Sequence, residues 1–159
     1  MVFYTTGFFI ESNYEALLLT AKFANENGGS FGYCFASEEV YESKKKETLE
    51  IMEYADYLFC NKQEAIAASK YIGTEIGISE DETNLDTIAR AFSLYSKHNH
   101  NRGRIALITD SCYSVTVAVS YPTMPELNIV FREVFKVPVI PVDEDRLVDS
   151  NGEIGRAHV

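Results

Sequence analysis

Three polar segments could support phosphate chemistry, and the first is Asn61-Lys-Gln-Glu64, which follows the apolar run Tyr57-Leu-Phe-Cys60. The spacing fits a helix capping box, in which Asn61 accepts from first-turn N–H groups and Glu64 reaches back to the backbone. A functional interpretation uses the same geometry, because strand ends line the ligand crevice in open α/β sheets. A carboxylate there can hold a hydrated Mg²⁺ beside phosphates. Spacing alone favours the cap and leaves the magnesium role of Glu64 open.

The second segment, Thr109-Asp-Ser111, separates two strand-like runs. Short polar side chains are common in turns because they hydrogen-bond to the local backbone. The alternative is a contact between the Thr109 hydroxyl and a bound nucleotide.

The third segment is Val148-Asp-Ser-Asn-Gly152, near the end of the chain. On its own it is a loop, since Asn-Gly is a common turn. It could also open a Gly-rich turn before a helix, where backbone N–H groups bind phosphate.

Other reactive residue types form no convincing site. His98 and His100 lie in a polar stretch with no carboxylate or thiol close in sequence, so no metal site is expected there. The run Lys44-Lys-Lys46 is best explained as a solvated helix end. The three cysteines are far apart without a CxxC pair, which favours reduced thiols: Cys34, Cys60 and Cys112.

The elements that would position these segments alternate between strands and helices. A buried strand is expected over Val2–Ile10, then strands over 31–35, 57–60, 104–109 and 114–119, the last two as a hairpin, and an edge or bent strand over 129–140. Helices are expected from Ser12 or Asn13 to about Asn27, through 49–52, over 62–72 and from Asn84 to Tyr95. Three further segments are expected to be irregular or exposed: 36–43, 74–83 and 97–103. This order predicts an α/β layered domain with a mostly parallel sheet.

Composition limits the class of protein. With 159 residues and 46% hydrophobic residues, the chain can fill one core and is not intrinsically disordered. A net charge of −10 argues against binding nucleic acid or an anionic membrane through the overall field. No apolar run approaches the roughly 20 residues of a transmembrane helix. We therefore expect a cytoplasmic protein, with a nuclear pool as a further location.

Four stretches, in order along the chain, carry a resemblance to a known family: Gly7-Phe-Phe9, Tyr54–Ala65, Ile105–Asp110 and Leu147–Gly152. The chain resembles an interior piece of the adenosine-phosphorylating branch of the ribokinase-like (PfkB) carbohydrate and nucleoside kinases. The resemblance implies a three-layer ribokinase-like sandwich, incomplete at both ends, in a parent that is monomeric. It also implies transfer of the ATP γ-phosphoryl to the 5′-hydroxyl of adenosine, with Mg²⁺, giving AMP and ADP in purine salvage.

The resemblance assigns roles by position. Asn61 and Glu64 match an Asn-x-x-Glu motif that arranges Mg²⁺ and phosphates, and Thr109 with Ser111 matches a Thr-x-Gly nucleotide contact. The positions Asp149, Ser150, Asn151 and Gly152 match the start of an anion-hole signature, Asp-Thr/Ser-Asn-Gly-Ala-Gly-Asp, whose last Asp is the general base.

The departures from the family pattern are as informative as the matches. After Gly152 the chain reads Glu153-Ile-Gly-Arg-Ala-His-Val159, which is what translation of a common short-read sequencing adapter gives. We expect residues 1–152 to be a partial nucleotide-binding domain and 153–159 to be a foreign tail. The N-terminal lid is also absent, and residues 29–43 lack the usual family segment. Ser111 replaces the family Gly, at a cost of about 1 kcal/mol if that position needs positive φ.

These departures leave no catalytic residue to name, so the chain itself is expected to be inactive. Two alternatives stay open: a parent kinase acting on a sugar or another nucleoside, and a short non-catalytic protein that binds nucleotide or a partner chain.

Overall fold

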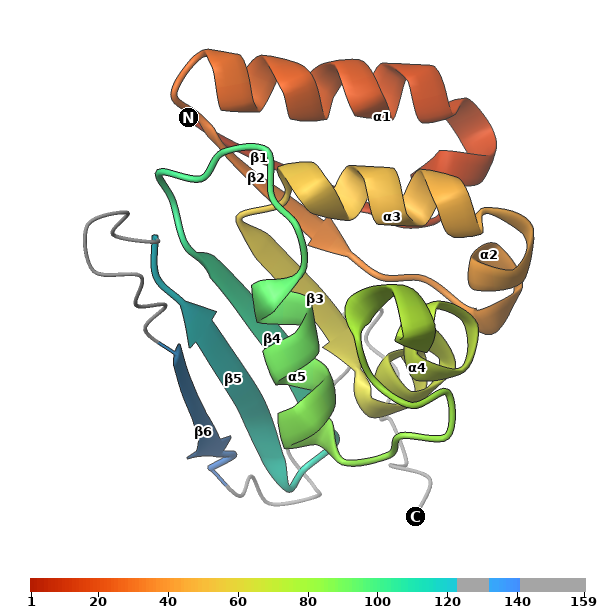
Figure 1. Ribbon diagram of the computed structural model, residues 1–159, viewed down its shortest axis with the longest axis vertical. Helices are drawn as coiled ribbons and strands as arrows, with labels where there is room; N and C mark the ends of the chain where they lie inside the picture. The colour runs from red at the N-terminus through yellow and green to blue at the C-terminus, as the bar shows by residue number, and fades with distance from the viewer. Residues whose placement is uncertain (123–131, 141–159) are drawn as a thin grey trace, which may run out of the picture.

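The computed structural model describes residues 1–122 and 132–140 and forms one six-stranded sheet in the order β1-β2-β3-β4-β5-β6 (Figure 1). The strands are β1 (Val2–Thr6), β2 (Ser30–Cys34), β3 (Tyr57–Asn61), β4 (Arg104–Asp110), β5 (Ser114–Ser120) and β6 (Arg132–Pro138). The first four are parallel, and β5 and β6 are antiparallel additions. The predicted mostly parallel sheet and the hairpin of β4 and β5 are confirmed.

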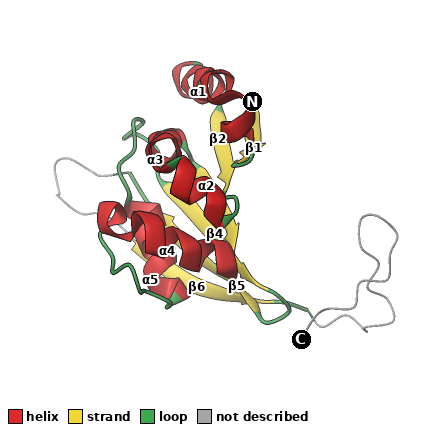
Figure 2. Cartoon of the chain, turned by 90° about the vertical axis from the view of Figure 1, so that its right-hand side faces the viewer, coloured by secondary structure: helices red, strands yellow, loops and turns green. Residues whose placement is uncertain are grey.

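Five helices connect the parallel strands: α1 (Phe9–Glu26), α2 (Glu38–Ser43), α3 (Lys45–Tyr54), α4 (Lys62–Ile76) and α5 (Leu85–Leu94). Right-handed connections that always step in one direction across a sheet place every helix on the same face. Figure 2 shows this arrangement, with the helices gathered on one side of the sheet. The described residues thus supply two layers of the predicted sandwich, a sheet and one layer of helices.

The core lies between the sheet and the helices because the strand residues alternate in burial. Leu58 and Cys60 of β3, and Ala106 and Ile108 of β4, face the helices and are buried. Along α1, Leu17, Ala21 and Ala24 are buried as well, and Leu18 is partly buried. The second face is less covered, and the side chains of Tyr4, Phe135 and Val137 are exposed.

The predicted strand over Val2–Ile10 is wrong in two respects. β1 ends at Thr6 and α1 begins at Phe9. β1 is also not buried, because it is the edge strand of the described sheet, and Val2 is 71% exposed. The predicted cap at Asn13 is confirmed: Asn13 interrupts α1 with φ −161°, and its side chain accepts from the Ala16 N–H at 3.0 Å. The element itself begins four residues earlier, at Phe9.

Two segments expected to be irregular contain helix. Glu38–Ser43 forms α2, with Val40 and Tyr41 buried, and α4 continues past residue 72 to Ile76, where Gly77 ends it at φ 81°. The basic run Lys44-Lys-Lys46, expected at a solvated helix end, lies at the start of α3, where Lys45 Nζ pairs with Glu75 Oε1 at 2.7 Å.

The stretch 97–103, expected to be an exposed turn, contains a buried cation. Lys97 is 9% exposed and donates to Asp56 Oδ1 at 2.5 Å, and also to the Arg102 and Gly103 carbonyl oxygens. Asp56 in turn accepts from the Phe31 N–H at 2.9 Å. The expectation was wrong because Lys97 and Asp56 are 41 residues apart in sequence. Burial lowers the pKa of Lys97, while the Asp56 carboxylate raises it.

Buried tyrosines make the fold sensitive to alkali. Burial raises the pKa of Tyr33, and raises that of Tyr41 well above its ordinary value near 10. Unfolded tyrosines lose protons at a lower pH than these two do, so the free energy of unfolding is expected to fall as pH rises above about 10. Tyrosinate absorbance and circular dichroism followed together should show these two groups ionising only as the chain unfolds. Tyr33→Phe should weaken this pH dependence, whereas Tyr113→Phe, at a 72% exposed position, should not.

Candidate active-site edge

The predicted site residues that the structure describes lie at the carboxyl edge of the sheet. β3 and β4 are parallel neighbours, and their last paired residues are Asn61 and Thr109. Carboxyl ends of parallel strands meet at one edge, which is where open α/β sheets bind ligands. The structure therefore brings Asn61 and Glu64 together with Thr109 and Ser111. In Figure 1, α4 starts at this end of β3.

Asn61 and Glu64 form the predicted capping box. Asn61 Oδ1 accepts from the Glu64 N–H at 2.9 Å, and Glu64 Oε2 accepts from the Asn61 N–H at 2.8 Å. These two bonds satisfy backbone donors that the first turn of α4 would otherwise leave free. Glu64 is half-buried, and its second oxygen accepts no hydrogen bond from a described residue. One carboxylate oxygen is thus committed to the helix and the other is available to a ligand.

Thr109 is the last residue but one of the neighbouring strand β4 and is exposed. Among the described residues, its hydroxyl makes only a long contact, 3.5 Å, with the Cys60 carbonyl oxygen. A loosely held hydroxyl can turn toward a ligand at small cost. The geometry is compatible with both the turn and the nucleotide interpretations of this segment.

Ser111 has φ 49°, the left-handed region that glycine adopts without penalty. The turn it occupies is tight, since the Tyr113 N–H donates to the Asp110 carbonyl oxygen at 2.9 Å. Ser111→Gly is therefore expected to stabilise the chain by about 1 kcal/mol. Urea denaturation measures this gain, and Ser114→Gly, inside β5, should instead destabilise; a loss of stability in Ser111→Gly would contradict the strain.

An ion pair that the sequence interpretation missed crosses this edge. Lys62 Nζ, from the first residue of α4, lies 3.2 Å from Asp110 Oδ2, from the last residue of β4. Lys62 and Asp110 directly follow the paired residues Asn61 and Thr109, so the ion pair connects the ends of β3 and β4. The one hint in the sequence was that each charged residue directly follows a predicted site residue. The ion pair itself could not be predicted, because 48 residues separate Lys62 from Asp110.

Burial disfavours the thiolate form of two cysteines of the sheet, Cys34 and Cys60. Burial raises the pKa of the Cys34 thiol, and raises that of Cys60 well above its usual range. Thiols with raised pKa values stay protonated near neutral pH and react poorly. Within residues 1–122 and 132–140 no group of three or more His, Cys, Asp or Glu side chains is placed to hold a metal ion.

Asp149, Ser150, Asn151 and Gly152 lie outside the described residues, so their predicted role stays a prediction. No helix in the described part of the chain is both long and apolar enough to cross a membrane.

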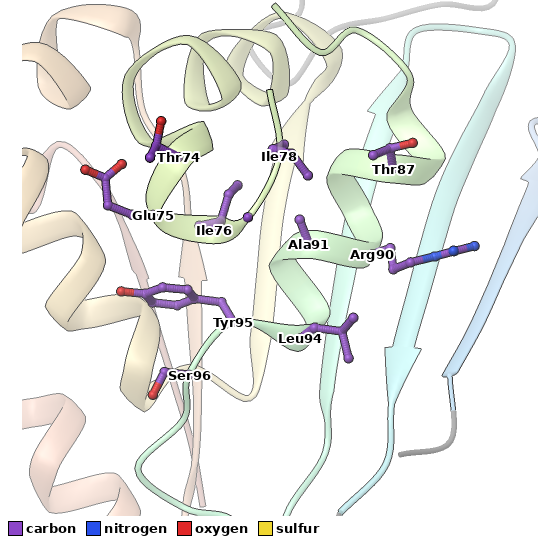
Figure 3. Close-up of a pocket in the computed structure, with 11 residues that line it drawn as sticks. Thr74, Glu75, Ile76, Ile78, Thr87, Arg90, Ala91, Leu94, Tyr95 and Ser96 are labelled. Atoms are coloured by element: carbon purple, nitrogen blue, oxygen red, sulfur yellow. The ribbon is translucent and has the colours of Figure 1, made fainter. Parts of the chain in front are cut away.

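A cavity of about 540 Å³ lies elsewhere, between the ends of α4 and α5 (Figure 3). Its apolar floor includes Ile76, Ile78 and Ala91. The carboxyl end of α4 forms its wall, whereas the amino end of the same helix forms the strand-edge site. Fifteen helical residues span about 22 Å, so the two are separate.

Comparison with known proteins agrees with the family that the sequence resembles. Adenosine kinase 2 of Arabidopsis thaliana is 29% identical over 150 residues, and the adenosine kinase of Schizosaccharomyces pombe is 26% identical over 151 residues. The crystal structure of Anopheles gambiae adenosine kinase in complex with P1,P4-di(adenosine-5) tetraphosphate superposes with a TM-score of 0.75 and 28% identity. The chain is similar to adenosine kinases. No family model matches it.

The similarity to adenosine kinases extends over 94% and 95% of this chain for the two curated relatives and 95% for the Anopheles structure. It covers only 39% of each relative and 40% of the solved chain, so the chain spans about two fifths of their length. The described α/β architecture is that of the ribokinase-like fold, as predicted.

Proposed function

We propose that the chain is the nucleotide-binding part of an adenosine kinase, whose parent transfers the ATP γ-phosphoryl to the 5′-hydroxyl of adenosine. The observation that carries the proposal is the gathering of Asn61, Glu64, Thr109 and Ser111 at one carboxyl edge, in a chain similar to adenosine kinases throughout. The Anopheles relative binds a ligand with two adenosines joined by four phosphates. Such a ligand contains both the adenosine and the polyphosphate that the proposed reaction brings together.

Each residue has a role in this proposal. The Thr109 hydroxyl and the backbone around Ser111 contact the nucleotide, while Asn61 holds Glu64 in place through the capping box. Mg²⁺ commonly binds through one or two carboxylates, with water and phosphates as the other ligands. A single Glu64 oxygen free of hydrogen bonds from described residues fits that pattern. The ion would neutralise phosphate charge during transfer.

Asp149 to Gly152 are proposed to begin the anion hole, with residues 153–159 a foreign tail. The general base expected three residues after Gly152 is replaced in this sequence, where position 155 is Gly. Losing a base typically reduces the rate by about 10² to 10⁴. We therefore propose that this chain binds nucleotide without turning it over, and substantial formation of AMP from adenosine and ATP by the purified chain would contradict this.

Calorimetric titration of the chain with ATP in the presence of Mg²⁺ tests the proposal. Thr109→Val removes one hydroxyl and should weaken ATP binding about three- to tenfold, the value of one hydrogen bond. Thr83→Val, which alters an exposed hydroxyl in the loop before α5, should leave binding unchanged. Equal affinities for all three proteins would argue against a nucleotide site at this edge.

Titration of the full-length parent with adenosine, ribose and fructose separates the alternatives for the acceptor. Binding of ATP with a sugar but not adenosine would favour another PfkB-family kinase. Binding of nucleotide with neither acceptor would favour a non-catalytic binding protein.

A further inference from the structure

We propose that Lys62 binds the polyphosphate of the nucleotide, and that Asp110 is the internal counter-ion that Lys62 leaves when the phosphates arrive. The inference rests on the proposed function and concerns the same edge. It assigns a phosphate contact and a competing carboxylate to two residues that carry no role in the proposal above.

The position of the ion pair is the first argument. Lys62 follows Asn61 directly and Asp110 follows Thr109 directly, and Asn61 and Thr109 are paired neighbours on β3 and β4. The Lys62–Asp110 contact of 3.2 Å therefore bridges the two halves of the proposed nucleotide site. A ligand that touches Thr109 and Glu64 at the same time must pass close to both charges.

The freedom of the lysine is the second argument. The Lys62 side chain is 49% exposed, and its ammonium group has three donors, of which Asp110 uses one among the described residues. Lys97 is the contrast within this chain, because it is buried and donates to three acceptors. Lys62 can turn to a new acceptor, whereas Lys97 cannot.

The balance of charge is the third argument. Exposed ion pairs contribute little, because water and salt screen them. A triphosphate offers Lys62 several negative charges in place of the single charge of Asp110, so exchange is favourable. Asp110 is 22% exposed and competes with the phosphates by holding Lys62, which must leave the carboxylate before it can bind them.

Titrations with inorganic tripolyphosphate and with ATP test the inference, using Lys62→Gln, Asp110→Asn and the double variant. Lys62→Gln should weaken both ligands about three- to tenfold, and Asp110→Asn should strengthen both by a similar factor. Asp110→Asn should have no effect in the Lys62→Gln background, since Asp110 acts by holding Lys62. Adenosine affinity should not change in any variant.

The pair formed by Lys70 and Glu38 supplies matched controls. Their contact is 2.6 Å, both side chains are at least half exposed, and Lys70 lies two turns along the same helix from Lys62. Lys70→Gln and Glu38→Gln should leave both affinities unchanged.

The other outcomes separate the possible failures. If Lys62→Gln and Asp110→Asn weakened ligand binding equally, the ion pair would only hold β4 and α4 together. That result would overturn the inference. If Asp110→Asn strengthened ligand binding in the Lys62→Gln background, Asp110 would simply repel the phosphates. That result would overturn the proposed exchange of Lys62 from Asp110 to the phosphates. ATP binding that neither variant alters would overturn the inference and leave the proposed function standing, whereas a wild-type chain that binds neither ATP nor tripolyphosphate would remove both.

Discussion

Arg104→Met is expected to destabilise the chain by about 3–5 kcal/mol, the largest loss of any polar substitution we predict. Arg104 begins β4 and is 1% exposed, with its side chain inside the core. Methionine fills a similar volume but donates no hydrogen bond. The total stability of a domain is commonly about 5–15 kcal/mol, so this loss would remove a large fraction of it.

The reason is that the Arg104 guanidinium satisfies the carboxyl ends of two helices. Near the end of α3 it donates to the Met52 and Ala55 carbonyl oxygens at 2.6 and 2.9 Å. Near the end of α5 it donates to three more, at 2.6 to 3.0 Å: Phe92, Tyr95 and Ser96. The last carbonyls of a helix have no partner within the helix, and they carry partial negative charge. Without Arg104, five buried or half-buried acceptors lose a charged donor at once.

Lysine should not rescue the substitution. Burial lowers the pKa of Arg104 to about 10, which still leaves it charged at neutral pH. A lysine has three donors on one atom, so it cannot reach acceptors on both helices as the planar guanidinium does.

Urea denaturation followed by circular dichroism measures the effect. Arg90→Met is the matched control, because the Arg90 side chain is exposed on α5 and makes no hydrogen bond or ion pair with a described residue. The midpoint of this variant should change little. An Arg104→Met midpoint within experimental error of Arg90→Met would contradict the double-cap role.

Features set by neighbouring residues were predictable from the sequence. The Asn61–Glu64 capping box depends on residues three positions apart, and it is confirmed. The positive φ of Ser111 could be anticipated from the family glycine, because a turn of that type constrains one residue.

Features that join distant parts of the chain were not predictable. Arg104 bonds carbonyls as far as 52 residues away, and Lys97 reaches Asp56 across 41 residues. A stretch of Lys, His and Asn has the composition of a solvated turn, so only the packed structure shows that Lys97 is inside. The exposure of β1 was also missed, because an apolar strand at a sheet edge has the same sequence pattern as a central strand.

A second large effect is expected from Gly103→Ala, beside the same arginine. A Cβ at Gly103 would lie 1.8 Å from the Ser120 carbonyl oxygen and 2.8 Å from the carbon of that carbonyl. Both are backbone atoms of β5, so neither can turn aside as a side chain could. Overpacking of this kind typically costs 1–3 kcal/mol, and we expect about 3 kcal/mol here.

The strain should reach the buried charges. Gly103 supplies a carbonyl oxygen to Lys97 at 3.0 Å, and the Ser120 hydroxyl accepts from the Arg104 N–H at 3.0 Å. Any movement that relieves the Cβ contact shifts one of these groups. Amide hydrogen exchange should therefore show lower protection in β4 and β5 of the variant, even where circular dichroism shows a folded chain.

Gly28→Ala separates steric cost from conformational cost. Gly28 has φ +71° and open space around a would-be Cβ, so alanine there should cost about 1 kcal/mol from the backbone alone. Gly103 has no positive φ, so its cost comes from contact alone. We expect a markedly lower urea midpoint for Gly103→Ala than for Gly28→Ala, because a backbone carbonyl in a sheet cannot move away. Equal midpoints for the two variants would show that the close approach of β5 to Gly103 is not a constraint.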